Sequence, residues 1–202
     1  MKKFVMKHCM NFIANNDESL TDENLEIISY GLEGLYLTVT KLIIIVTLSI
    51  ILNLWKEVII FLFIYNIIRM TSFGLHATKS WICLVSSTII FIGVPLFCES
   101  IIMDLHMKLL IGTICTILMF KNAPADTYKR PIVNPKRRLI YKLLSTGISI
   151  VMTIASIMVE NQFISNALIL ALVVQCHMIS PFIYRIFHLP YNNYKRYQHS
   201  SC

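Results

Sequence analysis

One segment of the chain, residues 69–83, combines a histidine and a cysteine with basic residues and a glycine. A cysteine becomes a nucleophile when a base or a positive field removes its proton, and an imidazole is a common base for this purpose. His76 precedes Cys83 by seven residues, and Arg69 and Lys79 add positive potential. Gly74 permits a bend or a close backbone approach. The segment is therefore a candidate site for a cysteine nucleophile with a histidine base.

The spacing between His76 and Cys83 requires a break in the helix. Seven residues along one straight helix lie on the same face but about 10.5 Å apart along the axis, which is too far for a hydrogen bond. A helix that begins near Ser80 would instead place Cys83 in its first turn, where the positive end of the helix dipole favours a thiolate. The alternative interpretation is a buried cysteine and an interfacial histidine with no chemical role.

The other cysteines do not form a comparable arrangement. The six cysteines show no Cys-x-x-Cys spacing, and Cys176 and His177 would point about 100° apart on a helix. His8 and Cys9 lie in a predicted surface helix. We therefore expect no disulfide framework, no metal site and no cofactor.

The composition is typical of a membrane protein. The 202 residues are 56% hydrophobic and only 14% charged, whereas soluble domains carry about 25% charged residues. This excludes an ordinary soluble enzyme, a disordered chain and a secreted disulfide scaffold. The net charge of +7 fits basic loops on anionic lipid, so membrane lipids and not nucleic acid are the expected partners.

Six apolar segments predict an all-α integral membrane protein, because a bilayer core needs roughly 20 apolar residues per helix. Lys and Arg gather in alternate loops, which places both termini in the cytoplasm by the positive-inside rule. The predicted membrane helices are Leu35–Leu54, Val58–Ile68 with an extension past Arg69, Trp81–Phe97, Ile101–Phe120, Leu139–Val159 and Phe163–Phe187.

Three regions are expected along the chain. Residues 1–34 form an N-terminal interfacial region with a basic amphipathic helix, followed by a helix that starts at Thr21 and runs into the first span. This region is either a surface anchor or a docking site for a substrate. Residues 35–187 form the polytopic membrane domain, and residues 188–202 form a cytoplasmic tail. The loop 121–138 holds three prolines and six basic residues, so it is an ordered turn region or a linker. Its basic residues either hold the topology or bind an anion or a peptide carboxylate.

Three sequence blocks resemble the accessory gene regulator B family, whose members are membrane-embedded cysteine endopeptidases that process quorum-sensing propeptides. Phe73 departs from the pattern, because many members carry a second glycine there. The resemblance covers nearly the whole chain, and its blocks are Arg69, Gly74, His76, Ala77 and Cys83, then Ala123–Thr127 with Arg130–Ile132, and finally Tyr30–Glu33.

The resemblance implies a reaction on a short amphipathic propeptide. Cys83 would attack a peptide carbonyl with His76 as base and then as acid. The C-terminal fragment would leave, and a substrate cysteine would then attack the acyl-thioester on Cys83 and close a thiolactone ring. The resemblance also implies a multi-pass protein of the bacterial cell membrane, a homodimer, and an active site on the cytoplasmic side.

Supporting roles follow for several other residues of the three blocks. Arg69 is expected to bind a substrate carboxylate or help stabilise an oxyanion, unless it is simply an interfacial arginine. Asp126, beside Pro124, either orients His76 or caps the loop. Pro124, Lys79 and Gly74 complete the expected set of supporting or substrate-binding residues.

Two other functional classes remain open at this point. A small multipass peptide transporter or exporter would use polar residues within the spans to line a path; Asp104 and Lys108, four residues apart, could instead pair with each other. A non-catalytic scaffold would use the basic loops to bind lipid or an acidic partner. The polar residues of the transport hypothesis are Lys41, Asp104, Lys108 and His177.

Overall fold

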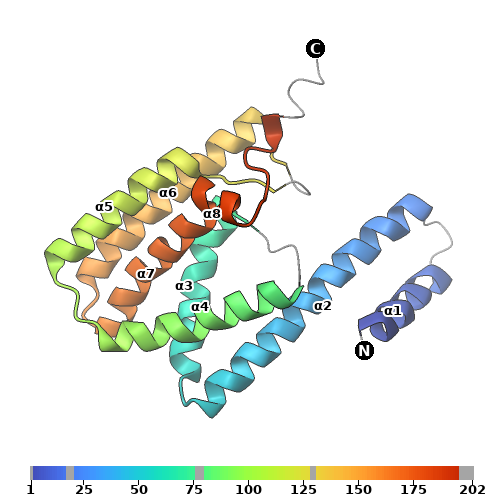
Figure 1. The fold of residues 1–202 in the computed structure, drawn as a ribbon, viewed down its shortest axis with the longest axis horizontal. Coiled ribbons are helices and arrows are strands. Elements are labelled where there is room, and N and C mark those ends of the chain that lie inside the picture. Colours follow the sequence, from blue (N-terminus) through green and yellow to red (C-terminus); the bar gives the residue numbers. More distant parts are fainter. Residues whose placement is uncertain (1, 17–20, 76–79, 128–130, 196–202) are drawn as a thin grey trace. The chain divides into compact units, whose positions relative to one another are not determined.

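The computed structural model describes residues 2–16, 21–75, 80–127 and 131–195, and every regular element in these ranges is an α-helix. The prediction of an all-α fold is therefore confirmed for the described residues. The chain divides into two compact units, residues 1–48 and 49–202. The helices, labelled in Figure 1, are α1 (Lys2–Asn16), α2 (Asp22–Ile51), α3 (Trp55–Ser72), α4 (Ser80–Ser100), α5 (Leu105–Asn122), α6 (Pro135–Met158), α7 (Gln162–Ile179) and α8 (Pro181–Ile186).

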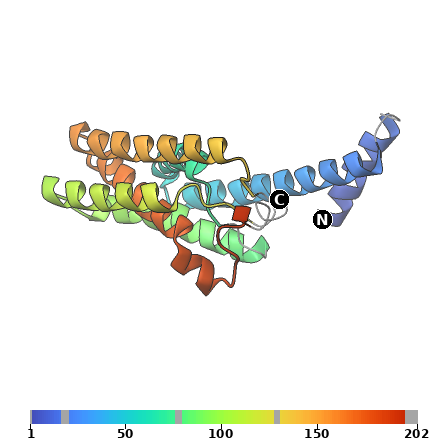
Figure 2. The same ribbon diagram turned by 90° about the horizontal axis from the view of Figure 1, so that it is seen from above.

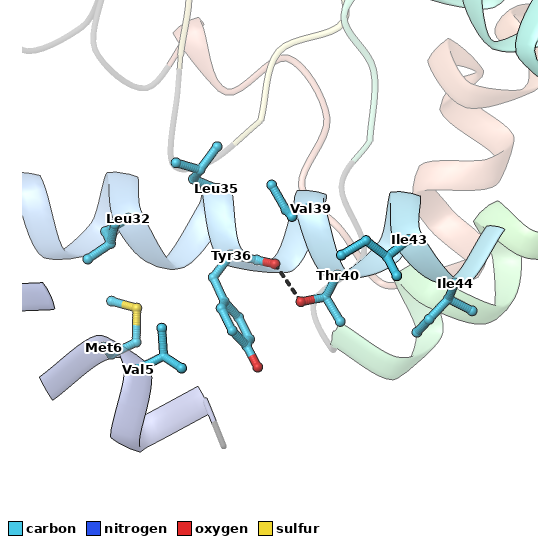
Figure 3. A pocket seen from close by; sticks show the side chains of 9 residues that line it. All are labelled: Val5, Met6, Leu32, Leu35, Tyr36, Val39, Thr40, Ile43 and Ile44. Carbon is cyan, nitrogen blue, oxygen red and sulfur yellow. Dashed lines mark hydrogen bonds between the residues drawn. The ribbon is translucent and has the colours of Figure 1, made fainter. Parts of the chain in front are cut away.

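The first unit contains α1 and most of α2. Thr21 begins α2 as predicted, because its hydroxyl accepts a hydrogen bond from the Asn24 N–H at 3.3 Å, and the helix runs without a break into the first apolar segment. An apolar pocket of about 460 Å³ lies between side chains of α1 and α2. Figure 3 shows the Thr40 hydroxyl directed to the Tyr36 carbonyl oxygen, to which it donates at 2.8 Å. This polar group is therefore satisfied within α2, and the pocket offers apolar contact.

The second unit is a helical bundle. Helices α5, α6 and α7 run side by side, and α3 and α4 pack against α7 (Figures 1 and 2). Small residues let the helices approach closely, as is common in membrane bundles: a Cβ on Gly112 of α5 would collide with Thr153 of α6. The Thr116 and Ser149 hydroxyls form a hydrogen bond of 2.9 Å between the same two helices. Much of the outward surface is apolar, as expected for contact with lipid.

Four of the described helices are long and apolar enough to cross a bilayer: Asn24–Ile51, Trp81–Ser100, Pro135–Met158 and Gln162–Ile179. They correspond to the first, third, fifth and sixth predicted spans, so the chain is membrane-embedded. The second and fourth predicted spans fall in α3 and α5, which are 18 residues each and are not among these four. The count of six spans and the location of the termini remain predictions.

Two predicted boundaries were wrong. The segment Phe163–Phe187 is not one helix, because α7 ends at Ile179 and Ser180 caps a new helix that begins at Pro181. Proline lacks an N–H and disfavours helical geometry in the preceding residue. Asp104 lies before α5 as its N-cap, where it accepts the Met107 N–H at 2.7 Å.

Three of the four polar residues of the transport hypothesis, Asp104, Lys108 and His177, have contacts that do not require a transport path. Lys108 does not pair with Asp104 but donates to the Ser165 hydroxyl at 2.7 Å. His177 Nδ1 lies 2.8 Å from the Val173 carbonyl oxygen of its own helix. These contacts tie helices together or cap them, as expected for structural polar groups in a bundle.

Candidate active site

Four segments that are distant in sequence meet at one end of the second unit. They are residues 72–75 after α3, residues 123–126 after α5, residues 175–178 of α7, and residues 184–194, and we call them together the loop junction. Gly74 N–H donates to the Ala125 carbonyl at 2.9 Å, and Ala125 N–H donates to the Ser72 carbonyl at 3.1 Å. Leu75 N–H donates to the Met178 carbonyl at 3.1 Å. The chain that leads to His76 is therefore fixed on two sides by backbone hydrogen bonds.

Arg69 holds the same loop through its guanidinium group. Its two terminal nitrogens donate to the carbonyl oxygens of Phe73 at 2.5 Å, Leu75 at 2.8 Å and Gly74 at 3.4 Å. A guanidinium suits this task because its donors form a rigid planar fork. Arg69 thus positions the backbone immediately before His76, a role that the sequence analysis did not predict. Contact between Arg69 and a substrate carboxylate or oxyanion remains a prediction.

Gln175 is a functional candidate that the sequence analysis missed. This fully buried residue of α7 donates from Nε2 to the Ser72 hydroxyl and to the Phe73 carbonyl, both at 2.6 Å. An uncharged amide within an apolar span was the available signal, because such a group needs hydrogen-bond partners in a bilayer. Its partners lie about a hundred residues away in sequence, so the pattern along the chain could not identify them.

Phe73, where the sequence differs from the family pattern, has an unusual backbone conformation. Phe73 has φ +56° and ψ −131°, a conformation that favours glycine, and Gly74 follows with φ +118°. Glycine, which many members of the resembling family carry at this position, adopts this backbone conformation more easily than phenylalanine. The Phe73 ring packs edge-on against Tyr141, with 4.9 Å between ring centroids.

Cys83 is the fourth residue of α4 as the structure describes that helix, from Ser80 to Ser100. Its side chain is half-buried, whereas Cys98, Cys115 and Cys176 are buried within the bundle. Among the cysteines described in the second unit, Cys83 alone is accessible. His76 and Lys79 lie outside the described residues, so the His76–Cys83 distance and the role of Lys79 remain predictions.

Asp126 is almost completely buried and anchors the C-terminal segment. Its two carboxylate oxygens accept the backbone N–H groups of Asn193 at 3.0 Å and Tyr194 at 2.9 Å. Arg138 Nη1 lies 3.6 Å from the same carboxylate. These contacts agree with loop capping, and orientation of His76 by Asp126 remains a prediction. Pro124, two residues earlier, is also buried and follows a cis peptide bond.

The part of the chain that the structure describes contains no group of three or more His, Cys, Asp or Glu residues that could hold a metal ion.

Comparison with known proteins identifies the family. The model of the family described as accessory gene regulator B matches residues 6–179. An AgrB-like protein of Clostridium acetobutylicum is 27% identical over 184 residues, covering 90% of this chain and 88% of the relative. An AgrB-like protein of Listeria welshimeri is 28% identical over 173 residues, covering 85% and 84%. No solved structure matches the chain.

The family match extends over both units, from α1 to the end of α7, and includes Arg69, Gly74, Cys83 and Asp126. The chain therefore belongs to the accessory gene regulator B family and has a role in the accessory gene regulator quorum-sensing system.

Proposed function

We propose that this protein is a membrane cysteine endopeptidase that cleaves a short amphipathic propeptide through Cys83 and cyclises the released peptide into a thiolactone. The observation that carries the proposal is the half-buried thiol of Cys83 in the first turn of α4. The membrane environment shelters such a thiol, while the helix N-terminus gives it a positive field. The cysteines at positions 98, 115 and 176 are buried in the bundle and unsuited to attack.

The positions of the helices support a dyad of His76 and Cys83. Helix α3 ends at Ser72, and the described part of α4 starts at Ser80. We propose that the chain bends between them, so that His76 and Cys83 are not separated by the rise of about 10.5 Å that one straight helix would impose. The backbone of residues 73–75 is held by Arg69, Ala125, Met178 and Gln175 up to the residue before His76. A backbone held in place up to the residue before His76 would help to position the imidazole as a base.

The reaction proceeds by two acyl transfers. His76 takes the proton from Cys83, the thiolate attacks the scissile carbonyl carbon, and the tetrahedral intermediate collapses with loss of the amine, which receives the proton from His76. The N-terminal part of the propeptide remains as a thioester on Cys83. A cysteine within that part attacks the thioester carbonyl, loses its proton to His76, and expels the Cys83 sulfur, which regains the proton.

The energetics of the two steps differ. Exchange of one thioester for another is nearly balanced in free energy, whereas exchange of a peptide bond for a thioester is uphill and requires removal of the product. Water must also be excluded, because hydrolysis of the thioester would release a linear peptide. A site at the membrane boundary fits this requirement. We place it on the cytoplasmic side, and we propose that the partners are the propeptide, surrounding lipids and a second copy of the chain.

Co-expression with the propeptide tests the function. Cys83→Ala and His76→Ala should each abolish cleavage, read by mass spectrometry of the propeptide. Cys9→Ala is the matched control, because Cys9 is also half-buried but lies in α1. A propeptide that lacks its internal cysteine should accumulate as an adduct on Cys83 in the intact-mass spectrum. Normal cleavage by the Cys83→Ala protein would disprove the proposal.

A further inference from the structure

A basic pocket of about 450 Å³ opens at the junction end of the bundle, beside the C-terminal segment. It lies between the end of α5, the first two turns of α6 and the tail, and it shares residues 123, 124, 191, 192 and 194 with the loop junction. We call it the basic pocket, and its lining residues are Lys121, Asn122, Ala123, Pro124, Arg138, Leu139, Lys142, Tyr191, Asn192 and Tyr194.

The charges around the basic pocket are not balanced. Three cations line it, namely Lys121, Arg138 and Lys142, and the described carboxylate nearby is that of Asp126, which already accepts two backbone N–H groups. Arg138 Nη1 is buried and has no hydrogen-bond partner among the described residues, although it lies 3.6 Å from Asp126. An incoming anion would satisfy this donor and neutralise the excess positive charge.

Aromatic rings keep two of these cations in place. The Arg138 guanidinium carbon lies 3.5 Å from the centroid of the Tyr194 ring, and Lys142 Nζ lies 4.8 Å from the centroid of the Phe120 ring. Such cation–π contacts hold a side chain in one place while leaving its N–H donors free for a ligand. The pocket is thus organised before an anion enters.

The edge of the basic pocket is apolar and exposed. Leu139 lines the pocket and is 57% exposed, Leu143 lies one helical turn further along α6 and is also 57% exposed, and Phe120 is 52% exposed. Exposed apolar residues on a membrane-embedded helix face lipid chains. The ligand that fits both the cations and this edge therefore has an anionic head and apolar chains.

We propose that the basic pocket binds the phosphate headgroup of an anionic phospholipid, whose acyl chains lie along Phe120, Leu139 and Leu143. Pockets of basic residues beside membrane helices bind such headgroups, and anionic lipids are abundant in the cytoplasmic leaflet of a membrane. An isolated carboxylate would satisfy the cations but would leave the apolar edge without a matching group, and an acidic amphipathic peptide is therefore the competing ligand in the test.

Lipid binding to the detergent-solubilised full chain tests the proposal. Native mass spectrometry would measure the affinity for phosphatidylglycerol, for phosphatidylcholine and for soluble glycerol phosphate. The double variant Lys121→Gln/Lys142→Gln should bind phosphatidylglycerol at least roughly tenfold more weakly, because it removes two charged donors that would contact the headgroup directly. The matched control is Lys136→Gln/Lys195→Gln, which removes the same charge from exposed residues that do not line the pocket.

The control should bind phosphatidylglycerol within twofold of the unmodified protein, and phosphatidylcholine binding should differ little among the three proteins. Equal loss in both double variants would overturn the proposal, because the effect would then be one of net charge. Glycerol phosphate that binds as tightly as the lipid would also overturn it, in favour of a soluble phosphate. A pocket variant that binds lipid normally but loses an acidic peptide would overturn it in favour of a peptide site. None of these measurements depends on peptidase activity.

Discussion

The guanidinium group of Arg69 fills the space in which a side chain on Gly74 would begin. A Cβ atom built on Gly74 would collide with Arg69 Nη1 and would lie 2.8 Å from the Met178 carbonyl oxygen. Because Arg69 donates to the carbonyl oxygens of residues 73–75, the absence of a side chain at position 74 is what lets the arginine reach them. Arg69 and Gly74 together fix the conformation of the backbone before His76.

Gly74→Ala should therefore displace the loop. The positive φ of +118° alone costs an alanine roughly 1–2 kcal/mol, and the collision with Arg69 adds to it. We expect propeptide cleavage to fall at least tenfold and the melting temperature in detergent to drop. Gly93→Ala is the matched control, because a Cβ on Gly93 within α4 would have no atom within 4 Å. Equal activity in the two variants would show that the loop tolerates the change.

Phe73 permits a separate test of backbone strain. A non-glycine residue at φ +56° and ψ −131° costs on the order of 1–3 kcal/mol, while the edge-on contact with Tyr141 returns about 1 kcal/mol in addition to burial. Phe73→Gly should relieve the strain and lose the ring, for a net change within about 1 kcal/mol. Phe73→Ala should keep the strain, lose the ring, and lower the unfolding free energy by about 2 kcal/mol. Chemical denaturation in detergent would measure both, and similar losses would argue against strain at this position.

Local sequence patterns predicted the helices better than their ends. Apolar length located the membrane segments, and the cap at Thr21 and the start of α4 at Ser80 followed from residue types at helix N-termini. Hydropathy failed at Pro181, because the residues on both sides are apolar and the break comes from backbone chemistry. It also placed Asp104 inside a span, although the side chain is a cap.

The contacts of the candidate site depend on long-range pairing that one sequence does not reveal. Gln175 joins Ser72 across 103 positions, and Asp126 joins Asn193 across 67. Residue types marked Arg69 and Asp126 as unusual polar groups, but several partners were possible for each. Helices that are distant in sequence pack together and bring the ends of α3, α5 and α7 close to one another. This packing decides which hydrogen-bond partner each side chain has.

Asp126→Asn should release the C-terminal segment. An amide nitrogen would face one of the two backbone N–H groups that the carboxylate now accepts, and the pairing with Arg138 would be lost. The expected cost is about 2–3 kcal/mol, with faster trypsin cleavage after Lys195. Asp104→Asn is the control, because asparagine caps a helix about as well as aspartate.

Comparison of Asp126→Asn with Asn193→Ala separates the two roles considered for Asp126. If the carboxylate only anchors the tail, Asn193→Ala should reduce cleavage of the propeptide in a similar way, since the Asn193 side chain donates to the carbonyls of Asp126 and Pro190. A loss of activity confined to Asp126→Asn, with the tail still protected from trypsin, would instead favour a role in orienting His76.

Tyr191 makes the attachment of the tail sensitive to alkaline pH. Burial raises the pKa of Tyr191 above its usual value of 10.0; the Asp126 carboxylate and Tyr194 act in the same direction, and Arg138 opposes them. At a pH between the pKa values of the unfolded and folded states, Tyr191 is protonated more fully in the folded protein. The free energy of unfolding is therefore highest below about pH 10 and falls as the pH rises above this value. Tyr191→Phe cannot ionise, although its ring can keep the edge-on contact with Tyr184. The variant should match the unmodified protein near pH 8 and exceed it in melting temperature near pH 11, whereas a constant difference across this range would contradict the argument.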